Sequence, residues 1–360
     1  MALEGFACYS FHPVPGIPIK VIALDDTDKR YHSSGGSLDA KRFQWLQTQL
    51  AAGQKADELM IVCAHVPLNM YSAIAMGDDP ANIKKRYLTS RWQGTQIPVD
   101  QILAACHNNS NLVLWAAGHE HRNTITPQAA SVSIPGAPAK HGFWVAETAS
   151  LRDFPHQFRS FRLIYNSSDP SIGGEPSISI LALDHDLAVR SGTPAFKSRL
   201  YAIGAMEIFQ AAQLPSNPLN NYQQGPGMDP NTCVYNAELV IPLAQLSPGL
   251  RRKLQNLGPV VGYSKVNGGT NAVASPTVTL NSSVLGSIPT AYRVCESPSF
   301  KGAHWKFYPG PGEPPPSFNL GRPSGSGAKI VYFQVKDGNG RMSPVVYDYV
   351  HFSKTTTLED

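Results

Sequence analysis

The sequence predicts two parts, a layered α/β domain followed by an all-β sandwich domain. In the first half, three apolar strand patterns at residues 19–24, 59–65 and 112–117 alternate with two amphipathic helical segments. Beyond residue 276, the chain carries short strand patterns separated by frequent turns. At 360 residues, each part is long enough to bury a core of its own.

The first helix is predicted between residues 37 and 53. Its apolar side chains recur at helical spacing and share one face: Phe43, Leu46 and Leu50. Either Ser37 or Asp39 is a suitable N-cap, because a short polar side chain can accept a hydrogen bond from the first turn. Gly53 is expected to end the helix.

Pro98 is expected to open the second helix, since its fixed φ suits the first helical turn. The inward-facing residues of this helix are Val99, Ile102, Leu103 and Cys106. The order strand, helix, strand, helix, strand is typical of a parallel α/β sheet.

The chain then changes to consecutive strands, predicted at residues 142–147, 158–165 and 177–183. Helices are expected at 197–210 and near 248–255. The composition of residues 264–275, rich in Gly, Asn and Ser, predicts a linker. The expected domains are therefore 1–263 for the α/β part and 276–360 for the β-sandwich.

Composition excludes several classes of protein. The net charge is only +4 and there is no basic run, so a nucleic-acid partner has no electrostatic support. No apolar stretch is long enough for a transmembrane span, and the first residues lack the features of a signal peptide. The five cysteines are scattered and never form C-x-x-C. Cys63 and Cys106 lie in apolar segments and are expected to be buried free thiols.

Histidines follow two of the predicted strands. His65 ends the strand at 59–65, and Gly118 separates the strand at 112–117 from His119 and His121. Ligands collect beyond the carboxyl ends of parallel strands, so three imidazoles there could hold a divalent transition metal. The alternative for His65 alone is a hydrogen-bonded histidine near a surface loop.

Two stretches carry a family resemblance. "IVCAHVPL" and "WAAGHEHRN" resemble the last two metal motifs of the calcineurin-like metallophosphoesterases, and the likeness extends over about residues 5–215. It implies an αββα sandwich with a two-metal centre that activates water. By motif, His65 and His119 would bind one metal and His121 the other. Arg122 or Asn123 would meet the phosphate, with a solvated loop as the alternative.

The chain departs from this family in its first motifs. Asp-x-His, Gly-Asp-x-x-Asp and Gly-Asn-His-Asp/Glu, which supply the bridging carboxylate, are not found. The N-terminal part of the fold is therefore expected to be missing and to act as a partner segment in cis or in trans. Of the two metals (Zn, Mn or Fe) in a complete enzyme, at most one would be held weakly here. Asp25 and Asp26 are possible substitute ligands, against the alternative of turn-forming aspartates.

The C-terminal part resembles fibronectin type III-like or immunoglobulin-like modules of bacterial surface and secreted proteins. The resemblance lies in "IPTAYRVCESPSF", "AHWKFY" and "KIVYFQVKDGNGRMSPVVYDYV". It implies a periplasmic or secreted protein, with a cytoplasmic location as the alternative.

Two functions follow as expectations. The first is a metal-dependent hydrolase of phosphate monoesters or diesters that is incomplete, and so weak or inactive, in this chain alone. The second is a non-catalytic extracellular binding or structural protein with a degenerate phosphoesterase domain.

Overall fold

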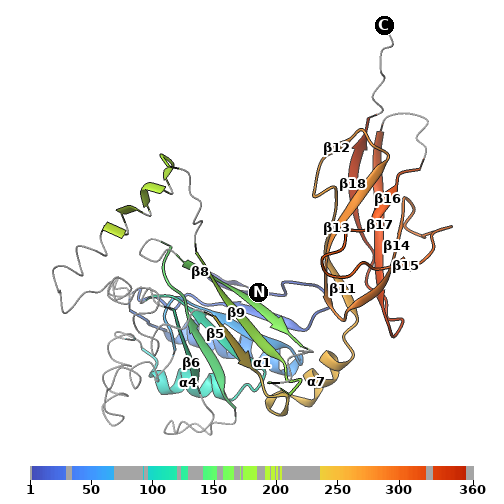
Figure 1. Ribbon diagram of the computed structural model, residues 1–360. Coiled ribbons are helices and arrows are strands. Elements are labelled where there is room, and N and C mark those ends of the chain that lie inside the picture. Colours follow the sequence, from blue (N-terminus) through green and yellow to red (C-terminus); the bar gives the residue numbers. More distant parts are fainter. Residues whose placement is uncertain are drawn as a thin grey trace. The chain divides into compact units, whose positions relative to one another are not determined.

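Figure 1 shows the computed structural model, in which the chain divides into two compact units. The α/β unit comprises residues 1–13 and 18–254, and the sandwich unit comprises residues 14–17 and 255–360. The structure describes residues 2–29, 35–68, 92, 96–119, 123–128, 141–151, 157–165, 171, 173–184, 191–194, 196–198, 200, 201, 203, 204, 236–321 and 327–353.

A seven-stranded sheet forms the centre of the α/β unit, with the order β1-β2-β3-β4-β5-β7-β6. Strands β3, β4, β5 and β7 are parallel, whereas β2 and β6 pair antiparallel at either side. The predicted strands at 19–24, 59–65 and 112–117 are confirmed as β3, β4 and β5. The strands are β1 (Ala2–Leu3), β2 (Cys8–Phe11), β3 (Ile19–Ala23), β4 (Leu59–Cys63), β5 (Leu112–Ala117), β6 (Thr124–Gln128) and β7 (Phe143–Glu147).

Helices α1 (Ala40–Lys55) and α4 (Val99–His107) form where the apolar periodicity predicts them. The Asp39 side chain caps α1 by accepting a hydrogen bond from Arg42 N. Gly53 does not end α1 as expected, because the helix continues to Lys55. A Cβ at Gly53 would overlap the Met60 side chain, so this glycine allows the helix to pack closely on β4.

The seven-stranded sheet packs on both faces. One apolar cluster joins it to α1 and α4, with Leu46, Ile102 and Trp115 fully buried. A second cluster joins its other face to an antiparallel three-stranded sheet in the order β10-β9-β8 and to α7. These elements are β8 (Gln157–Ile164), β9 (Ser177–Asp184), β10 (Ala237–Val240), the 3-10 turn η2 (Leu243–Gln245) and α7 (Pro248–Gln255).

The α/β class is thus confirmed, while the outer helical layer of an αββα sandwich remains an expectation. The predicted helix at 248–255 is α7. The helix predicted at 197–210 is described only in part, and residues 205–235 lie outside the described residues. Among the residues that the structure describes, no helix is long and apolar enough to cross a membrane.

The sandwich unit consists of two sheets that enclose an apolar core. The three-stranded sheet has the order β11-β13-β16 and the five-stranded sheet the order β12-β18-β17-β14-β15. Val278, Phe333 and Val350 are fully buried between them. The strands are β11 (Pro259–Val266), β12 (Ala272–Val273), β13 (Thr277–Gly286), β14 (Pro289–Cys295), β15 (Lys306–Phe307), β16 (Ser317–Asn319), β17 (Gly327–Asp337) and β18 (Val346–Phe352).

The structure corrects the predicted linker at 264–275 and the domain limits 1–263 and 276–360. Strand β11 pairs with β13 from Pro259 to Val266, and β12 pairs with β18. Residues 267–269, an Asn-Gly-Gly stretch with positive φ at each residue, form a turn within the sandwich. A composition that favours a turn thus resembles that of a linker, and the sequence boundary between the two units falls after Leu254.

The two cysteines expected to be buried differ in exposure. Cys106 is fully buried on α4, as predicted. Cys63, the last residue of β4, is exposed rather than buried.

Candidate metal site

The candidate site lies beyond the carboxyl ends of the parallel strands. Because β3, β4 and β5 run in the same direction, the residues that follow them emerge at one edge of the sheet. His65 lies two residues after β4, and His119 lies two residues after β5. The parallel arrangement thus brings together segments that are 54 residues apart in sequence.

The two imidazoles are in direct contact. His119 Nδ1 lies 3.3 Å from His65 Nε2, and the ring centroids are 5.1 Å apart at an interplanar angle of 80°. Two nitrogens on one tetrahedral Zn²⁺, each about 2.0–2.1 Å from the ion, are separated by about 3.3 Å. The observed separation fits two ligands of a single metal ion, and it equally fits a direct hydrogen bond between the two rings.

The backbone at His119 adopts an uncommon conformation. Its φ is +85°, a region that residues with a side chain rarely adopt. Just before it, Gly118 N donates a hydrogen bond of 3.1 Å to the carbonyl oxygen of His65. Left-handed residues cluster at functional sites, where surrounding contacts hold them. Here the contact to the loop after β4 helps to hold the chain that presents His119.

Asp26 lies beneath the loop after β4. It is fully buried, and its Oδ1 and Oδ2 accept hydrogen bonds of 2.9 Å from the backbone N–H groups of His65 and Val66 respectively. Burial raises the pKa of Asp26 to about 7, although these hydrogen bonds act in the opposite direction. With both oxygens engaged, Asp26 supports the loop, which differs from the expected role of a substitute ligand.

Asp25 is held by its own neighbours. Its carboxylate accepts a hydrogen bond from Thr27 Oγ1 and forms an ion pair of 2.9 Å with Lys29. Although burial acts to raise it, these contacts with Lys29 and Thr27 lower the pKa of Asp25. Asp25 therefore corresponds to the turn-forming alternative.

The remaining predicted site residues follow β5. His121 and Arg122 lie outside the described residues. Asn123 is buried, with Nδ2 donating to Gln157 Oε1 at 2.6 Å and Oδ1 accepting from Ala149 N at 3.1 Å. Both ends of its carboxamide are therefore occupied. Asn123 ties three segments of the chain together, which corrects the expectation that it contacts a phosphate.

Glu147 is a carboxylate at this sheet edge that the sequence did not single out. It ends β7 and is paired in register with Ala117 of β5. Its Oε2 accepts a hydrogen bond from Thr124 Oγ1, and the residue is 1% exposed. No motif marks it, because its position depends on the pairing of strands that are distant in sequence.

The histidine pair does not form a complete ligand set within the part of the chain that the structure describes. No group of three or more His, Cys, Asp or Glu side chains suitable for a metal occurs there. Two neutral imidazoles supply no negative charge, so they do not offset the positive charge of a divalent cation. The described residues therefore fit part of a metal site and need further ligands.

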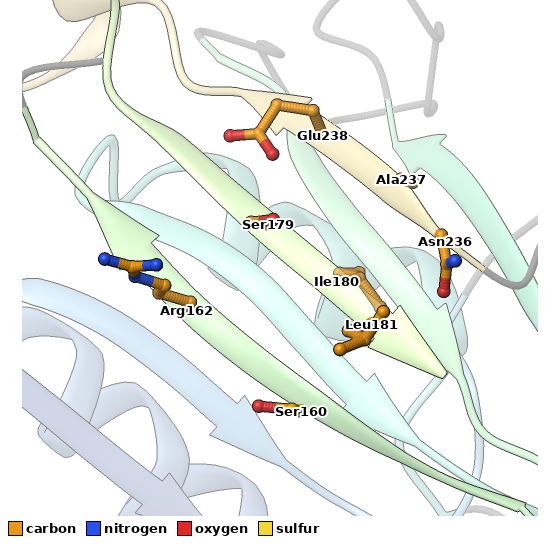
Figure 2. Close-up of a pocket in the computed structure, with 8 residues that line it drawn as sticks. All are labelled: Ser160, Arg162, Ser179, Ile180, Leu181, Asn236, Ala237 and Glu238. Carbon is orange, nitrogen blue, oxygen red and sulfur yellow. The ribbon is translucent and has the colours of Figure 1, made fainter. Parts of the chain in front are cut away.

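A shallow pocket of about 500 Å³ lies elsewhere, on the three-stranded sheet of the α/β unit (Figure 2). The strand register places Arg162, Ser179 and Glu238 in one row across β8, β9 and β10. Ser177 donates a short hydrogen bond to Glu238 Oε1. The buried Ile178 of the same strand faces the opposite, inner side. The pocket thus opens on the outer face, and the polar row gives no indication of a ligand.

Comparison with known proteins gives limited likenesses. No protein-family model and no curated protein matches this chain. The PKD1 domain of Vibrio anguillarum Epp matches over 27% of this chain and 94% of that domain, with 13% identity and a TM-score of 0.18. The PKD1 domain from the Vibrio cholerae metalloprotease PrtV matches over 27% of this chain and 98% of that domain, with 14% identity and a TM-score of 0.18.

A dimetal phosphatase from Danio rerio matches over 50% of this chain and 58% of its own length, with 11% identity and a TM-score of 0.33. These likenesses are compatible with an α/β part and an immunoglobulin-like part at low similarity. At such TM-scores they carry no argument about function, which rests on the geometry of the histidine pair.

Proposed function

We propose that this chain contributes the histidine half of a metal centre that hydrolyses phosphate esters. The observation that supports the proposal is the 3.3 Å separation between His119 Nδ1 and His65 Nε2, at the open ends of two parallel strands. His121, two residues after His119, is the third proposed ligand. When bound, a divalent transition metal such as Zn²⁺, Mn²⁺ or Fe would polarise the phosphoryl oxygens and lower the pKa of a water nucleophile.

The chain's own contribution is to hold imidazoles in place. His65 and His119 bring one ring nitrogen each to within 3.3 Å of the other, and the Gly118–His65 hydrogen bond links the segments that carry them. Arg122 is proposed to bind the phosphate, because a guanidinium matches phosphate oxygens in geometry and charge. Preorganised ligands reduce the cost of ordering the site when the metal binds.

Carboxylates are the missing component of the proposed centre. Two metal ions close together repel each other strongly, and a bridging carboxylate offsets this repulsion. We propose that a segment carrying such carboxylates completes the site, in cis or in trans, and that without it at most one metal is held weakly. We also propose that the protein acts outside the cytoplasm, in the periplasm or after secretion, because its sandwich unit resembles modules of secreted proteins.

A second candidate is a non-catalytic extracellular binding or structural protein. It is favoured by one observation, namely that no third metal-binding side chain joins the histidine pair among the described residues. The two candidates differ in whether a carboxylate-bearing segment restores turnover.

The test is hydrolysis of p-nitrophenyl phosphate and bis-p-nitrophenyl phosphate in excess Mn²⁺ or Zn²⁺. The chain alone should be close to background, because partial ligand sets do not hold the ions and the water together. Addition of a metallophosphoesterase N-terminal segment, fused or separate, should raise turnover, and His119→Ala should abolish the gain. Turnover that never rises with any such segment would favour the second candidate.

A further inference from the structure

We infer that Asp26 is a positioning residue that fixes His65 against His119, and this inference rests on the proposed metal site. Asp26 acts on the peptide backbone, where Oδ1 and Oδ2 each accept one N–H from the consecutive residues His65 and Val66, both at 2.9 Å. A carboxylate that accepts hydrogen bonds from two consecutive backbone N–H groups restricts both the position and the orientation of that backbone segment.

The carbonyl groups of His65 and Val66 are bound by Trp115 of β5 and by Gly118, the residue after β5. The Val66 carbonyl accepts a hydrogen bond of 3.0 Å from Trp115 Nε1, and the His65 carbonyl accepts one of 3.1 Å from Gly118 N. Trp115 is fully buried, so its indole is a fixed support. The two N–H groups of His65 and Val66 thus donate to Asp26, and their two carbonyl oxygens accept from Gly118 N and Trp115 Nε1. All four backbone hydrogen-bonding groups of these two residues are therefore satisfied.

Asp26 is itself anchored by α1. Arg42 Nη1 donates to the carbonyl oxygens of Asp25 at 2.8 Å and Thr27 at 2.9 Å, which flank Asp26 on either side. Arg42 is 2% exposed, and its Nε donates to the N-cap residue Asp39 at 3.0 Å. A series of buried and part-buried hydrogen bonds, joined through the backbone at residues 25–27, thus connects the start of α1 to the His65 loop and onward to β5.

This chain of contacts explains why a fully buried carboxylate occurs here. A buried acceptor is energetically costly unless its hydrogen bonds are made. Asp26 accepts two hydrogen bonds, from the backbone N–H groups of His65 and Val66, which lie beyond the end of β4 and outside its strand pairing. Its position after a parallel strand, at the edge where the histidines emerge, predicts a ligand. The geometry assigns it instead to the support of a ligand.

The variant Asp26→Asn tests the inference. Its carboxamide retains one acceptor oxygen but turns an NH₂ group toward the second amide, so two donors face each other. The matched control is Asp25→Asn, the same change one residue earlier. The Asp25 side chain contacts Thr27 and Lys29 and lies 3.9 Å from Arg42 Nη1, but it makes no hydrogen bond to the amides of His65 and Val66. Zn²⁺ affinity should fall at least about tenfold in Asp26→Asn and stay near wild type in Asp25→Asn.

A metal-free readout separates this inference from the proposed function. The rings of His65 and His119, at a centroid distance of 5.1 Å, should give a nuclear Overhauser effect in the apo protein. Asp26→Asn should weaken it and Asp25→Asn should retain it. An unchanged effect and unchanged Zn²⁺ affinity in Asp26→Asn would overturn the inference. If the effect behaves as expected while wild type and His119→Ala bind Zn²⁺ equally, Asp26 positions His65 but the proposed metal role is rejected.

Hydrogen exchange in the wild type covers the case in which Asp26→Asn does not fold. The amides of His65 and Val66 lie beyond the end of β4, where a loop amide would ordinarily exchange quickly. Held by Asp26, they should be protected to the level of the β4 and β5 amides. Exchange at the rate of an exposed loop would contradict the inference.

Discussion

Replacing His141 with phenylalanine should change how the stability of the α/β unit depends on pH. His141 is 2% exposed, and its ring nitrogens make no hydrogen bond of good geometry in the described part of the chain, although backbone groups of His107 and Leu112 lie close enough to favour the charged ring slightly. Burial, together with the nearby His107, lowers the pKa of His141 from 6.5 to about 4. A neutral imidazole is therefore strongly favoured in the folded state.

The sign and size follow from the two pKa values. Between pH 4 and 6.5 the unfolded chain binds a proton at His141 that the folded chain does not, so stability rises with pH in this window. One pH unit corresponds to about 1.36 kcal/mol, so acidification from pH 6.5 to 4 should cost roughly 3 kcal/mol through this residue. Phenylalanine removes that cost.

Asp26 acts in the opposite direction. Its pKa is raised from 3.8 to about 7, so its contribution to the free energy of unfolding is fully present below pH 3.8 and is lost as the pH rises to 7. The wild-type profile therefore combines opposing slopes. The difference between wild type and His141→Phe isolates His141, because the Asp26 contribution is common to both proteins.

The assay is urea unfolding at intervals from pH 4 to 7, followed by tryptophan fluorescence in a Trp305→Phe background. Trp305 is the sole tryptophan of the sandwich unit, so the remaining signal reports on the α/β unit. Relative to wild type, His141→Phe should gain roughly 3 kcal/mol between pH 6.5 and 4. Val145→Ala, a buried change nearby, should cost the same at each pH. A difference between wild type and His141→Phe that is constant with pH would refute the reasoning.

Three further predictions concern the sandwich unit. Gly286→Ala should lower the free energy of unfolding by at least about 1–2 kcal/mol, because φ is +77° and the new Cβ would overlap the backbone oxygen of Gly258. Denaturant titration measures this change, and an unchanged midpoint would show that the turn can relax. Asp337→Ala removes an acceptor that binds Asn339 N, Arg341 N and Ser287 Oγ, and should lower stability by about 2–3 kcal/mol, with only the sandwich transition shifting. A fragment of residues 255–353 should unfold cooperatively, whereas one of residues 267–353, which lacks β11, should not; cooperative unfolding of both would contradict the revised boundary.

Much of the α/β fold could be predicted because its signals are local. Apolar runs and helical spacing define β3, α1, β4, α4 and β5, and parallel strands then require His65 and His119 to emerge at one edge. The contact between the two rings follows from topology rather than from any longer motif.

The predictions that were wrong concern residues whose roles depend on contacts distant in sequence. An aspartate in a turn and an aspartate that accepts two amides look alike in sequence, since the amides that Asp26 binds lie 39 and 40 residues away. The residues from 267 to 269 favour a turn, but sequence does not say whether a turn joins strands or domains. The position of Asn123 after the histidine motif predicts a phosphate contact, but the residues that occupy its carboxamide, Ala149 and Gln157, are 26 and 34 residues away and no local pattern reveals them.

The most direct test of the proposed metal site is calorimetric titration of the purified chain with Zn²⁺. Wild type should bind one equivalent, and His65→Ala and His119→Ala should each lower the affinity at least about tenfold, because each removes one of two nitrogens that lie 3.3 Å apart. His304→Ala, a change at an exposed histidine of the sandwich unit, should leave the titration unchanged. Equal Zn²⁺ binding by wild type, His65→Ala and His119→Ala would contradict the account.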